Sequence, residues 1–348
     1  MTSGNALALP AEVAQLAVRA RLLDLIGASW MSRTVAVAAE LRLADHLAAG
    51  ALDLAALAPL CACDAAALRR LLRAMTSLGL CIEPREDCFE STPPLALLRS
   101  GASCGLRAQA LWWGSQWPLW QSLGESVRTG RRARTEGGSG TDIDPDAQPP
   151  ADLFDDAMAE LTRLVVPSLL TACDFSQARR LIDLGSGRGE LLLAVAGAHP
   201  ALRGTIFDLA QAQAGAHAAI AAAGAASRCG FVAGDFFEAV PTGFDVYLMK
   251  SILHCWPDAR CSAILRKVRA AMAREARVVL VERLLPPPLR CGESDREASR
   301  MDLHMLLGPG GRERTLDEIT LLGQHCGLAL LRAAPLSLGF HVVEFGPL

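Results

Sequence analysis

A glycine-rich turn at residues 183–189 is the segment whose residue types most directly suggest chemistry. It reads Asp183-Leu-Gly-Ser-Gly-Arg-Gly189, follows a short apolar run and precedes a helical pattern at residues 191–197. Glycines at Gly185 and Gly187 let the backbone turn tightly and approach a ligand closely. Any tight strand-to-helix turn can need glycine, so the spacing alone does not define a site. Because Glu190 stands where the dinucleotide fingerprint needs glycine, the turn departs from G-x-G-x-x-G.

Two later strand ends complete the pattern of a nucleoside site. Asp208, followed by Leu209, ends the second candidate strand, where a carboxylate can bind both ribose hydroxyls. That contact requires a free 2′-hydroxyl, which disfavours a 2′-phosphorylated cofactor. Gly234-Asp235-Phe236 ends the third strand, and its carboxylate and aromatic ring suit the amino group and the face of adenine. Since ligands of open α/β sheets lie at the carboxyl ends of strands, we expect one nucleoside-binding site.

His254 is the candidate general base. It follows the fourth candidate strand, where a lone histidine is ordinarily a solvated loop residue. If the ligand at this edge were a weak acid such as a phenol, of pKa ~10, moving its proton to a histidine of pKa ~6.5 would be uphill by about 5 kcal/mol. A neighbouring carboxylate can reduce this gap by stabilising the imidazolium.

A metal site is the alternative use of such side chains. His254, Cys255, Cys261 and His304 have suitable ligand atoms, but no compact ligand spacing supports zinc. We therefore predict no metal.

The elements that would position these residues alternate between strand and helix after residue 178. Such alternation predicts a parallel sheet covered by helices, and two final strands would close it as an antiparallel pair. A capping box, Thr315 with Glu318, opens a helix that would stop at Gly327. The candidate strands span residues 180–184, 204–207, 230–232, 246–249, 278–282, 328–332 and 340–345.

The first hundred residues have a different pattern. Residues 11–50 and 52–79 are helical by their apolar spacing, and a short hairpin at residues 80–91 follows, which is the outline of a winged helix. Arginines 69, 70 and 73 would lie on its candidate recognition helix. A DNA-binding function is one interpretation, but a solvated face is favoured because no wider basic surface accompanies them.

We therefore divide the chain into a helical and winged-helix domain (1–100), a connecting region (101–150) and an α/β domain (151–348). Residues 131–150 are rich in Gly, Asp, Pro and Arg and predict a polar linker. Before it lie four tryptophans, which suit either an aromatic pocket or core packing: Trp112, Trp113, Trp117 and Trp120.

Bulk composition narrows the class further. The chain has 348 residues, 51% of them hydrophobic, and a net charge of −3, which gives no general attraction to nucleic acid or anionic membrane. Its 11 cysteines are scattered without a C-x-x-C pair, as in a reducing compartment. With no signal peptide and no apolar run of ~20 residues, we expect a soluble, cytoplasmic protein.

In this order the motifs resemble those of the class I methyltransferases, and nearly the whole chain is similar to the two-domain small-molecule O-methyltransferases of plants and bacterial secondary metabolism. The resemblance implies a Rossmann-like domain that binds S-adenosyl-L-methionine, an N-terminal dimerisation domain and a homodimer. The matching segments are residues 39–45, 68–74, 182–187, 234–237, 245–250, 253–254 and 311–315.

The resemblance also implies roles for residues. Glu282 and Glu313 match carboxylates that flank the catalytic histidine, which favours His254 as the base. The substrate pocket would contain Met158, Trp256, Met301, His304 and Met305, although ordinary core packing suits the last three equally well. The expected cofactor contacts are Asp183, Gly185, Gly187, Asp208, Leu209, Gly234, Asp235, Phe236 and Lys250.

One residue departs from the family pattern. The family usually has His-Asp-Trp where this chain has His254-Cys255-Trp256. We expect Cys255 to be a passive thiol, since direct methyl transfer needs no nucleophile from the protein. O-methylation of a phenolic hydroxyl on a small aromatic natural product is the leading expectation. N- or C-methylation, or non-methylating chemistry on the same scaffold, stays open.

Overall fold

The computed structural model describes residues 11–132 and 151–348. The contacts divide the chain after Gly114 into two compact units, Met1–Gly114 and Ser115–Leu348. The connecting region expected at residues 101–150 is thus shared between both units. The same division places Trp112 and Trp113 in the first unit and the other two tryptophans in the second. Residues 133–150 of the expected linker lie outside the described residues.

The first unit has the expected helical and winged-helix architecture. Its hairpin, β2 (Cys81–Arg85) and β3 (Cys88–Ser91), is confirmed, and it pairs with β1 (Leu52–Asp53) in the order β1-β3-β2. The helices buried around this sheet bring together Leu43, Leu72 and many other apolar side chains. They are α2 (Ser29–Glu40), α3 (Leu43–His46), α4 (Leu54–Leu60), α5 (Ala65–Ser77), α6 (Pro93–Ala96) and α7 (Arg107–Ser115). Helix α1 (Ala11–Gly27) precedes them, and none of its described side chains belongs to this core.

The helical block expected at residues 52–79 is divided into β1, α4 and α5. Asp64 causes the second break, because its side chain caps α5 by accepting the N–H of Ala67 at 2.8 Å. On α5, Arg69 forms an ion pair with Asp87 of the hairpin turn.

Helix α1 exposes apolar side chains along its length. Leu23 and Ile26 are 66% and 70% exposed, and Leu16, Val18 and Leu25 are similarly uncovered. No single described helix is long and apolar enough to cross a membrane. The helical segments Gln15–Gly27 and Ser29–Glu40, which meet at a bend, reach that length and apolar composition only when they are taken together.

The second unit contains a seven-stranded sheet in the order β6-β5-β4-β7-β8-β10-β9. Neighbouring strands from β6 to β8 are parallel, and β10 is antiparallel to both β8 and β9, as expected. All seven strands lie where the sequence predicted them, with ends moved by up to three residues. They are β4 (Arg180–Leu184), β5 (Arg203–Asp208), β6 (Cys229–Ala233), β7 (Val246–Lys250), β8 (Arg277–Arg283), β9 (Leu328–Pro335) and β10 (Phe340–Pro347).

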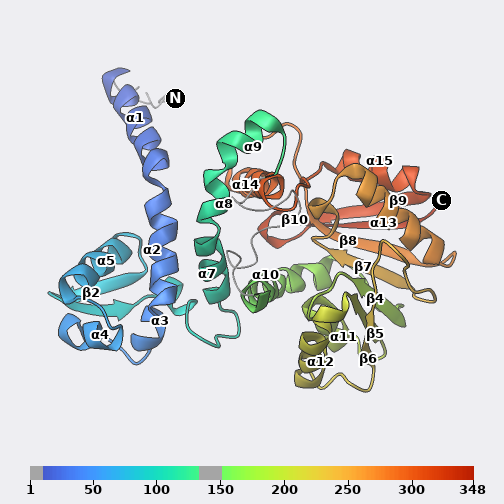
Figure 1. Ribbon diagram of the computed structural model, residues 1–348, viewed down its shortest axis with the longest axis horizontal. Helices are drawn as coiled ribbons and strands as arrows, with labels where there is room; N and C mark the ends of the chain where they lie inside the picture. The colour runs from blue at the N-terminus through green and yellow to red at the C-terminus, as the bar shows by residue number, and fades with distance from the viewer. Residues whose placement is uncertain (1–10, 133–150) are drawn as a thin grey trace, which may run out of the picture. The chain divides into compact units, whose positions relative to one another are not determined.

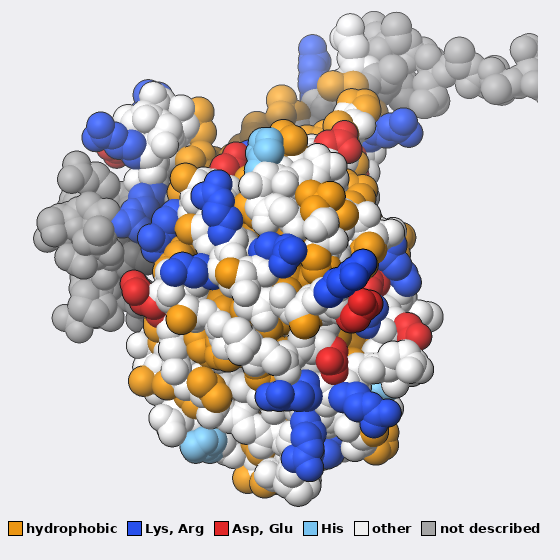
Figure 2. All heavy atoms as spheres, turned by 90° about the vertical axis from the view of Figure 1, so that its right-hand side faces the viewer, with side chains coloured by type: hydrophobic (Ala, Val, Ile, Leu, Met, Phe, Trp, Pro, Cys, Tyr) orange, Lys and Arg blue, Asp and Glu red, His pale blue; other side chains and the backbone are white. Residues whose placement is uncertain are grey.

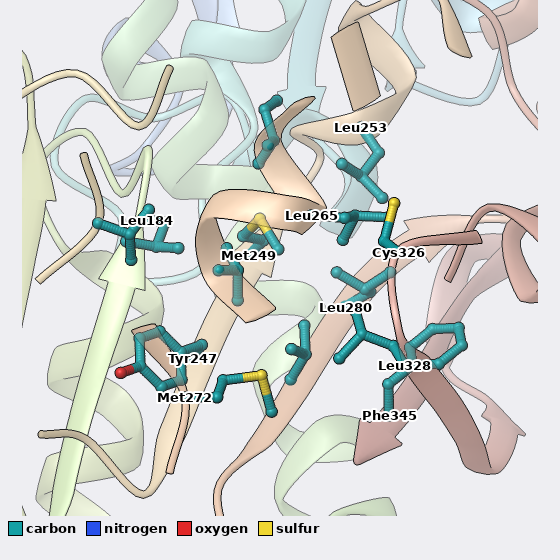
Figure 3. Close-up of a cluster of buried hydrophobic side chains, with 14 of the residues drawn as sticks. Leu184, Tyr247, Met249, Leu253, Leu265, Met272, Leu280, Cys326, Leu328 and Phe345 are labelled. Atoms are coloured by element: carbon teal, nitrogen blue, oxygen red, sulfur yellow. The ribbon is translucent and has the colours of Figure 1, made fainter. Parts of the chain in front are cut away.

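Helices cover both faces of this sheet (Figure 1). On one face, α13 (Asp258–Ala271) and α15 (Leu316–His325) enclose the cluster drawn in Figure 3, in which Leu265 and Cys326 meet Leu280 of β8. The predicted capping box of Thr315 and Glu318 is confirmed at the start of α15. On the other face lie α10 (Ala151–Ala172), α11 (Glu190–Ala198) and α12 (Gln213–Ala222).

Three further α-helices lie among the described residues of this unit. They are α8 (Trp117–Gln121), α9 (Leu123–Thr129) and α14 (Glu293–Leu307), with α14 in contact with both α8 and α9. All 11 cysteines are among the described residues, and none of them is in a disulfide, as expected.

Candidate active site

The glycine turn lies at the carboxyl end of β4, between its two parallel neighbours. Gly185 and Gly189 have φ of +71° and +84°, a region that favours glycine. A Cβ on Gly185 would lie 2.4 Å from Ile252 Cδ1, and one on Gly189 would lie 2.1 Å from Ile206 Cδ1. The turn therefore needs glycine both for its backbone conformation and for its close packing.

Two carboxylates lie beside this turn. Asp208, at the end of β5, accepts the N–H groups of Gly187 and Leu209, each at 2.7 Å. Asp235 follows β6, and its Oδ1 accepts the N–H of Phe237 at 2.8 Å. The ends of three adjacent strands thus place the residues that the sequence singled out along one edge of the sheet.

Two buried ionisable side chains, Asp183 and Lys250, lie along the same edge of the sheet. Burial raises the pKa of Asp183 to about 7, against the opposing effects of Ser186 and Lys250. The Ser186 hydroxyl donates to Asp183 Oδ2 at 2.5 Å. Burial also lowers the pKa of Lys250, at the end of β7, to about 8.

His254 lies just beyond β7 in a short 3-10 helix, η2 (Leu253–Cys255). The chain turns into this helix at Ser251, which has φ of +56°. The His254 ring is buried, and its Nδ1 lies 2.9 Å from Glu313 Oε1. Because one ring nitrogen is engaged by a carboxylate, Nε2 is the nitrogen suited to exchange a proton with a ligand.

Glu282 lies on the other side of η2, at the end of β8. Its Oε1 accepts the N–H groups of Ile252 at 3.0 Å and Leu253 at 2.8 Å. Burial raises the pKa of Glu282. Within the described residues, Glu282 Oε2 and Glu313 Oε2 are buried and without hydrogen-bond partners.

The environment of His254 acts on its pKa in two directions. Burial opposes the charged imidazolium and lowers the pKa, but Cys255, Glu313 and Glu282 raise it. The result is a pKa well above the ordinary value. The site therefore favours the state in which the imidazole has accepted a proton.

Comparison with known proteins follows the same division of the chain. The O-methyltransferase domain family matches residues 120–329, and the O-methyltransferase dimerisation domain matches residues 23–94. A phenazine O-methyltransferase of Lysobacter antibioticus is 37% identical over 94% of this chain and 96% of its own. The chain belongs to the O-methyltransferase family.

Solved structures agree with this assignment. A mitomycin 7-O-methyltransferase is 32% identical with a TM-score of 0.85, covering 97% of this chain and 100% of its own. The neocarzinostatin O-methyltransferase NcsB1 is 30% identical with a TM-score of 0.75, covering 91% of this chain and 96% of its own, and was solved with S-adenosylmethionine and a naphthoic acid. This methyltransferase is accordingly an S-adenosylmethionine-dependent enzyme of the class I fold.

The cofactor edge of the methyltransferase fits such a ligand. A Cβ on Gly234 would lie 2.5 Å from Phe207 Cε2, so the backbone here is packed as closely as at Gly185. Phe236 is only partly buried and lies edge-on to Phe237, with ring centroids 4.9 Å apart. An aromatic ring and two carboxylates at neighbouring strand ends suit an adenine and a ribose.

A buried guanidinium that the sequence analysis did not single out holds the histidine loop in place. Arg314 Nη1 donates to Leu253 O at 3.0 Å, and Nη2 donates to Trp256 O at 2.7 Å. The Arg314 side chain is 1% exposed and also bonds Asp258. It belongs to the Gly-Arg-Glu-Arg-Thr segment that resembles the family, so the motif was visible, but nothing in the sequence indicated that its last arginine reaches back to η2.

Close packing at Gly311 holds the same loop. A Cβ there would lie 2.0 Å from His254 O, and the N–H of Arg312 donates to that oxygen at 2.9 Å. The N–H of Glu313 in turn donates to Asp302 Oδ1 at 2.9 Å. Glu313 is therefore presented to His254 by a backbone that has little freedom to move.

Helix α14 carries three residues expected in the substrate pocket. Met301, His304 and Met305 are all buried, at a spacing that puts them on one face of the helix. The His304 ring stacks on Trp120, with centroids 6.3 Å apart and an interplanar angle of 19°. Burial lowers the pKa of His304 to about 4, aided by the nearby charges of His254 and Arg300, so this ring is neutral at pH 7.

The other expected pocket residues have different surroundings. Met158 lies on α10 and is half-buried. Trp256 lies edge-on to Phe237 at 4.9 Å and beneath the Arg260 guanidinium, as part of the packing around α13. Cys255 is half-buried, and its Sγ is 3.8 Å from Ser251 O.

The ligand-type atoms of His254, Glu282 and Glu313 lie within 4.8 Å of one another, close enough to hold a cation. The sequence also suggested Cys255, Cys261 and His304 as ligands. Within the described residues, none of these three side chains belongs to the group. Two of the available atoms are already engaged. His254 Nδ1 is hydrogen-bonded to Glu313, and Glu282 Oε1 accepts two backbone N–H groups. The arrangement suits a histidine held by carboxylates.

Proposed function

We propose that this methyltransferase methylates a phenolic hydroxyl of a small aromatic molecule, with His254 as the general base. The observation that supports this most directly is the 2.9 Å contact between His254 Nδ1 and Glu313 Oε1 in a buried setting. A neutral base whose charged form is stabilised by a carboxylate is what deprotonation of a weak acid requires.

S-adenosylmethionine supplies, when bound, a methyl group on a positively charged sulfur. On the protein side, Asp208 and Asp235 would hold the ribose and adenine, and Phe236 would lie against the adenine face. Gly185, Gly187 and Gly234 would let the backbone approach closely, with Asp183, Leu209 and Lys250 completing the wall. These roles extend the expectations from the sequence to residues that lie along one edge of the sheet.

The proton of the acceptor would pass to His254 Nε2. A phenol loses its proton near pH ~10, and each unit of difference from the base costs about 1.4 kcal/mol. Against the effect of burial, Cys255, Glu313 and Glu282 raise the pKa of His254 above its ordinary value and so reduce this cost. Glu282 also fixes the backbone of Ile252 and Leu253, which sets the position of the ring.

The acceptor class is inferred from the relatives and the α14 face. One relative is a phenazine O-methyltransferase, and another was solved with a naphthoic acid, so fused aromatic rings are a shared feature. Met301, Met305 and the neutral His304 ring would pack against such a ring system, with Met158 contributing from α10. Thioether and aromatic side chains make favourable contacts with aromatic ligands.

We also infer a homodimer. The dimerisation-domain match supports it, and so do the exposed apolar side chains of α1. Large exposed apolar surfaces are uncommon on monomers.

The test is incubation of the purified protein with methyl-labelled S-adenosylmethionine and a panel of phenolic phenazines, hydroxynaphthoic acids and simple phenols. We expect label on a hydroxyl oxygen of at least one fused-ring acceptor, and mass spectrometry and NMR identify the labelled atom. The same product should form in the presence and in the absence of EDTA. Asp208→Asn should weaken cofactor binding, while the exposed control Asp317→Asn should not.

Label on nitrogen or carbon alone would contradict the acceptor assignment. Loss of transfer in EDTA would contradict the base mechanism, because it would make a cation part of the His254 site. Tight cofactor binding with no transfer to any fused-ring phenol would contradict the proposed reaction.

A further inference from the structure

A row of three arginines lies at the beginning of the parallel strands, at the edge opposite the active site. Arg180 of β4 is in direct register with Arg203 of β5. Gly204 of β5 is in register with Cys229 of β6, so the residues that precede them, Arg203 and Arg228, lie side by side. The N–H of Gly204 also donates to Arg228 O at 2.9 Å. Arginine is therefore the first residue of β4 and of β5 and the residue just before β6, and the three lie in the same row.

These side chains line a hollow of about 300 Å³, together with Thr205, Ser227 and Phe244. Figure 2 faces the side where these strands begin, and Lys and Arg side chains gather on the lower part of that face. The hollow is open to solvent and large enough for a small oxyanion.

Carboxylates do not neutralise this row. Among the residues that the structure describes, Arg180, Arg203 and Arg228 form no ion pair with Asp or Glu. Asp245 lies nearby, but its Oδ2 accepts the backbone N–H groups of Arg179 and Arg180. Other arginines of the same unit are paired with acids, and Arg188 alone contacts three aspartates.

Unpaired like charges in adjacent strands are unfavourable, and arginine cannot relieve them by losing a proton. Two of the three guanidiniums are also held in place. Arg228 Nη1 donates to Ala196 O at 2.6 Å and Leu202 O at 3.3 Å, and Arg180 lies 4.9 Å from the centre of the Phe244 ring. Anchored cationic side chains around one hollow lose little freedom when an anion binds.

We propose that this hollow, defined by Arg180, Arg203 and Arg228, is a binding site for a small phosphate-class anion, a phosphomonoester or diphosphate. Guanidinium forks match phosphate oxygens in bidentate geometry, and three of them balance an anion of two or more charges. The site is separate from methyl transfer, since the five-residue rise from Arg203 to Asp208 spans about 17 Å of strand. It does not depend on the proposed acceptor.

The experiment is a calorimetric titration of the full chain, in the oligomeric state that it adopts in solution, with inorganic pyrophosphate at constant ionic strength. S-adenosylhomocysteine is present at saturation, so that the cofactor edge is occupied. We expect saturable binding with one anion per chain. Arg203→Gln should weaken it at least about ten-fold, as loss of a charge-assisted hydrogen bond predicts.

Arg274→Gln is the matched control, because Arg274 is exposed just before β8 but does not line the hollow. It should bind pyrophosphate as the wild type does. Equal losses in the two variants, or no saturable heat in the wild type, would overturn the proposal. Binding of duplex DNA that exceeds pyrophosphate binding and is lost in Arg203→Gln would also overturn it, because the row would then serve a polyanion surface.

Discussion

At the scale of single residues, Glu313 influences the charge of the proposed base, His254. Its Oε1 contacts His254 Nδ1, and its negative charge stabilises the imidazolium. His254 must be neutral to accept a proton, so kcat/KM should rise with pH through its elevated pKa.

Replacing Glu313 by Gln removes the charge but keeps the shape. The pKa of His254 should fall, and the acidic limb of the kcat/KM profile should therefore move to lower pH, with a lower plateau because the base is weaker. The measurement is a pH–rate profile at saturating cofactor. An unchanged limb in Glu313→Gln, with the fold intact by circular dichroism, would show that Glu313 does not act on the titrating group.

Cys255 replaces the aspartate usual in the family, which allows a converse test. Cys255→Asp keeps an acidic side chain beside His254, while the neutral Cys255→Asn removes a side chain that raises the pKa of His254, so the acidic limb should lie at higher pH in Cys255→Asp and at lower pH in Cys255→Asn. We expect the plateau rate of both variants to stay within about ten-fold of the wild type, because the thiol has no chemical step of its own. A loss of about 100-fold or more in both variants would mean that the thiol takes part in the reaction.

At the scale of elements, the turn that follows α14 determines where η2 lies. Arg314 bonds two carbonyl oxygens of the histidine loop, and its side chain is almost fully buried. Arg314→Met should leave both oxygens buried without this donor, which should lower the free energy of unfolding by about 1–3 kcal/mol for each oxygen. The same change should lower kcat more than it lowers the affinity for the cofactor.

Arg312→Met provides the comparison at a half-buried position whose side chain is 42% exposed. Its ion pairs with Asp258 and Glu318 are solvent-accessible, so its loss should cost less than about 1 kcal/mol. Denaturant unfolding and steady-state kinetics measure both effects. Similar behaviour of the two variants would show that the contacts of Arg314 with η2 are unimportant.

The predictability of the elements depended on local signals. Strands β4 to β8 are short apolar runs between helical segments, and Thr315 with Glu318 is a local capping signal, so both could be recognised from sequence. The break between α4 and α5 was missed, because the Asp64 cap lies within a continuous apolar pattern. Arg314 was missed because its partners are about 60 residues away, and long-range hydrogen bonds leave no periodic signal.

At the scale of the whole molecule, the dimerisation domain should govern oligomeric state. Leu23 of α1 is 66% exposed, and Leu321 of α15 in the other unit is 52% exposed. Light scattering after size exclusion should show a dimer for the wild type and for Leu321→Asp, and a monomer for Leu23→Asp. A dimer that persists in Leu23→Asp, or a monomeric wild type, would contradict a role for α1 in association.

The whole-molecule architecture was easier to infer than the site contacts. The order of motifs indicated two domains and a parallel sheet with an antiparallel closure, and the structure confirms this order. The placement of Trp256 against Phe237 and of Trp120 against His304 could not be inferred, because aromatic residues pack equally well in a core or a pocket.

The central claim is that His254 takes the proton of the acceptor. The most direct measurement is single-turnover methyl transfer by His254→Ala with an accepted phenol, alongside the binding constant for S-adenosylmethionine. We predict a rate lower by about 10²–10⁴-fold with cofactor affinity unchanged, as loss of a positioned general base requires. A rate within about ten-fold of the wild type at the same cofactor affinity would contradict this account.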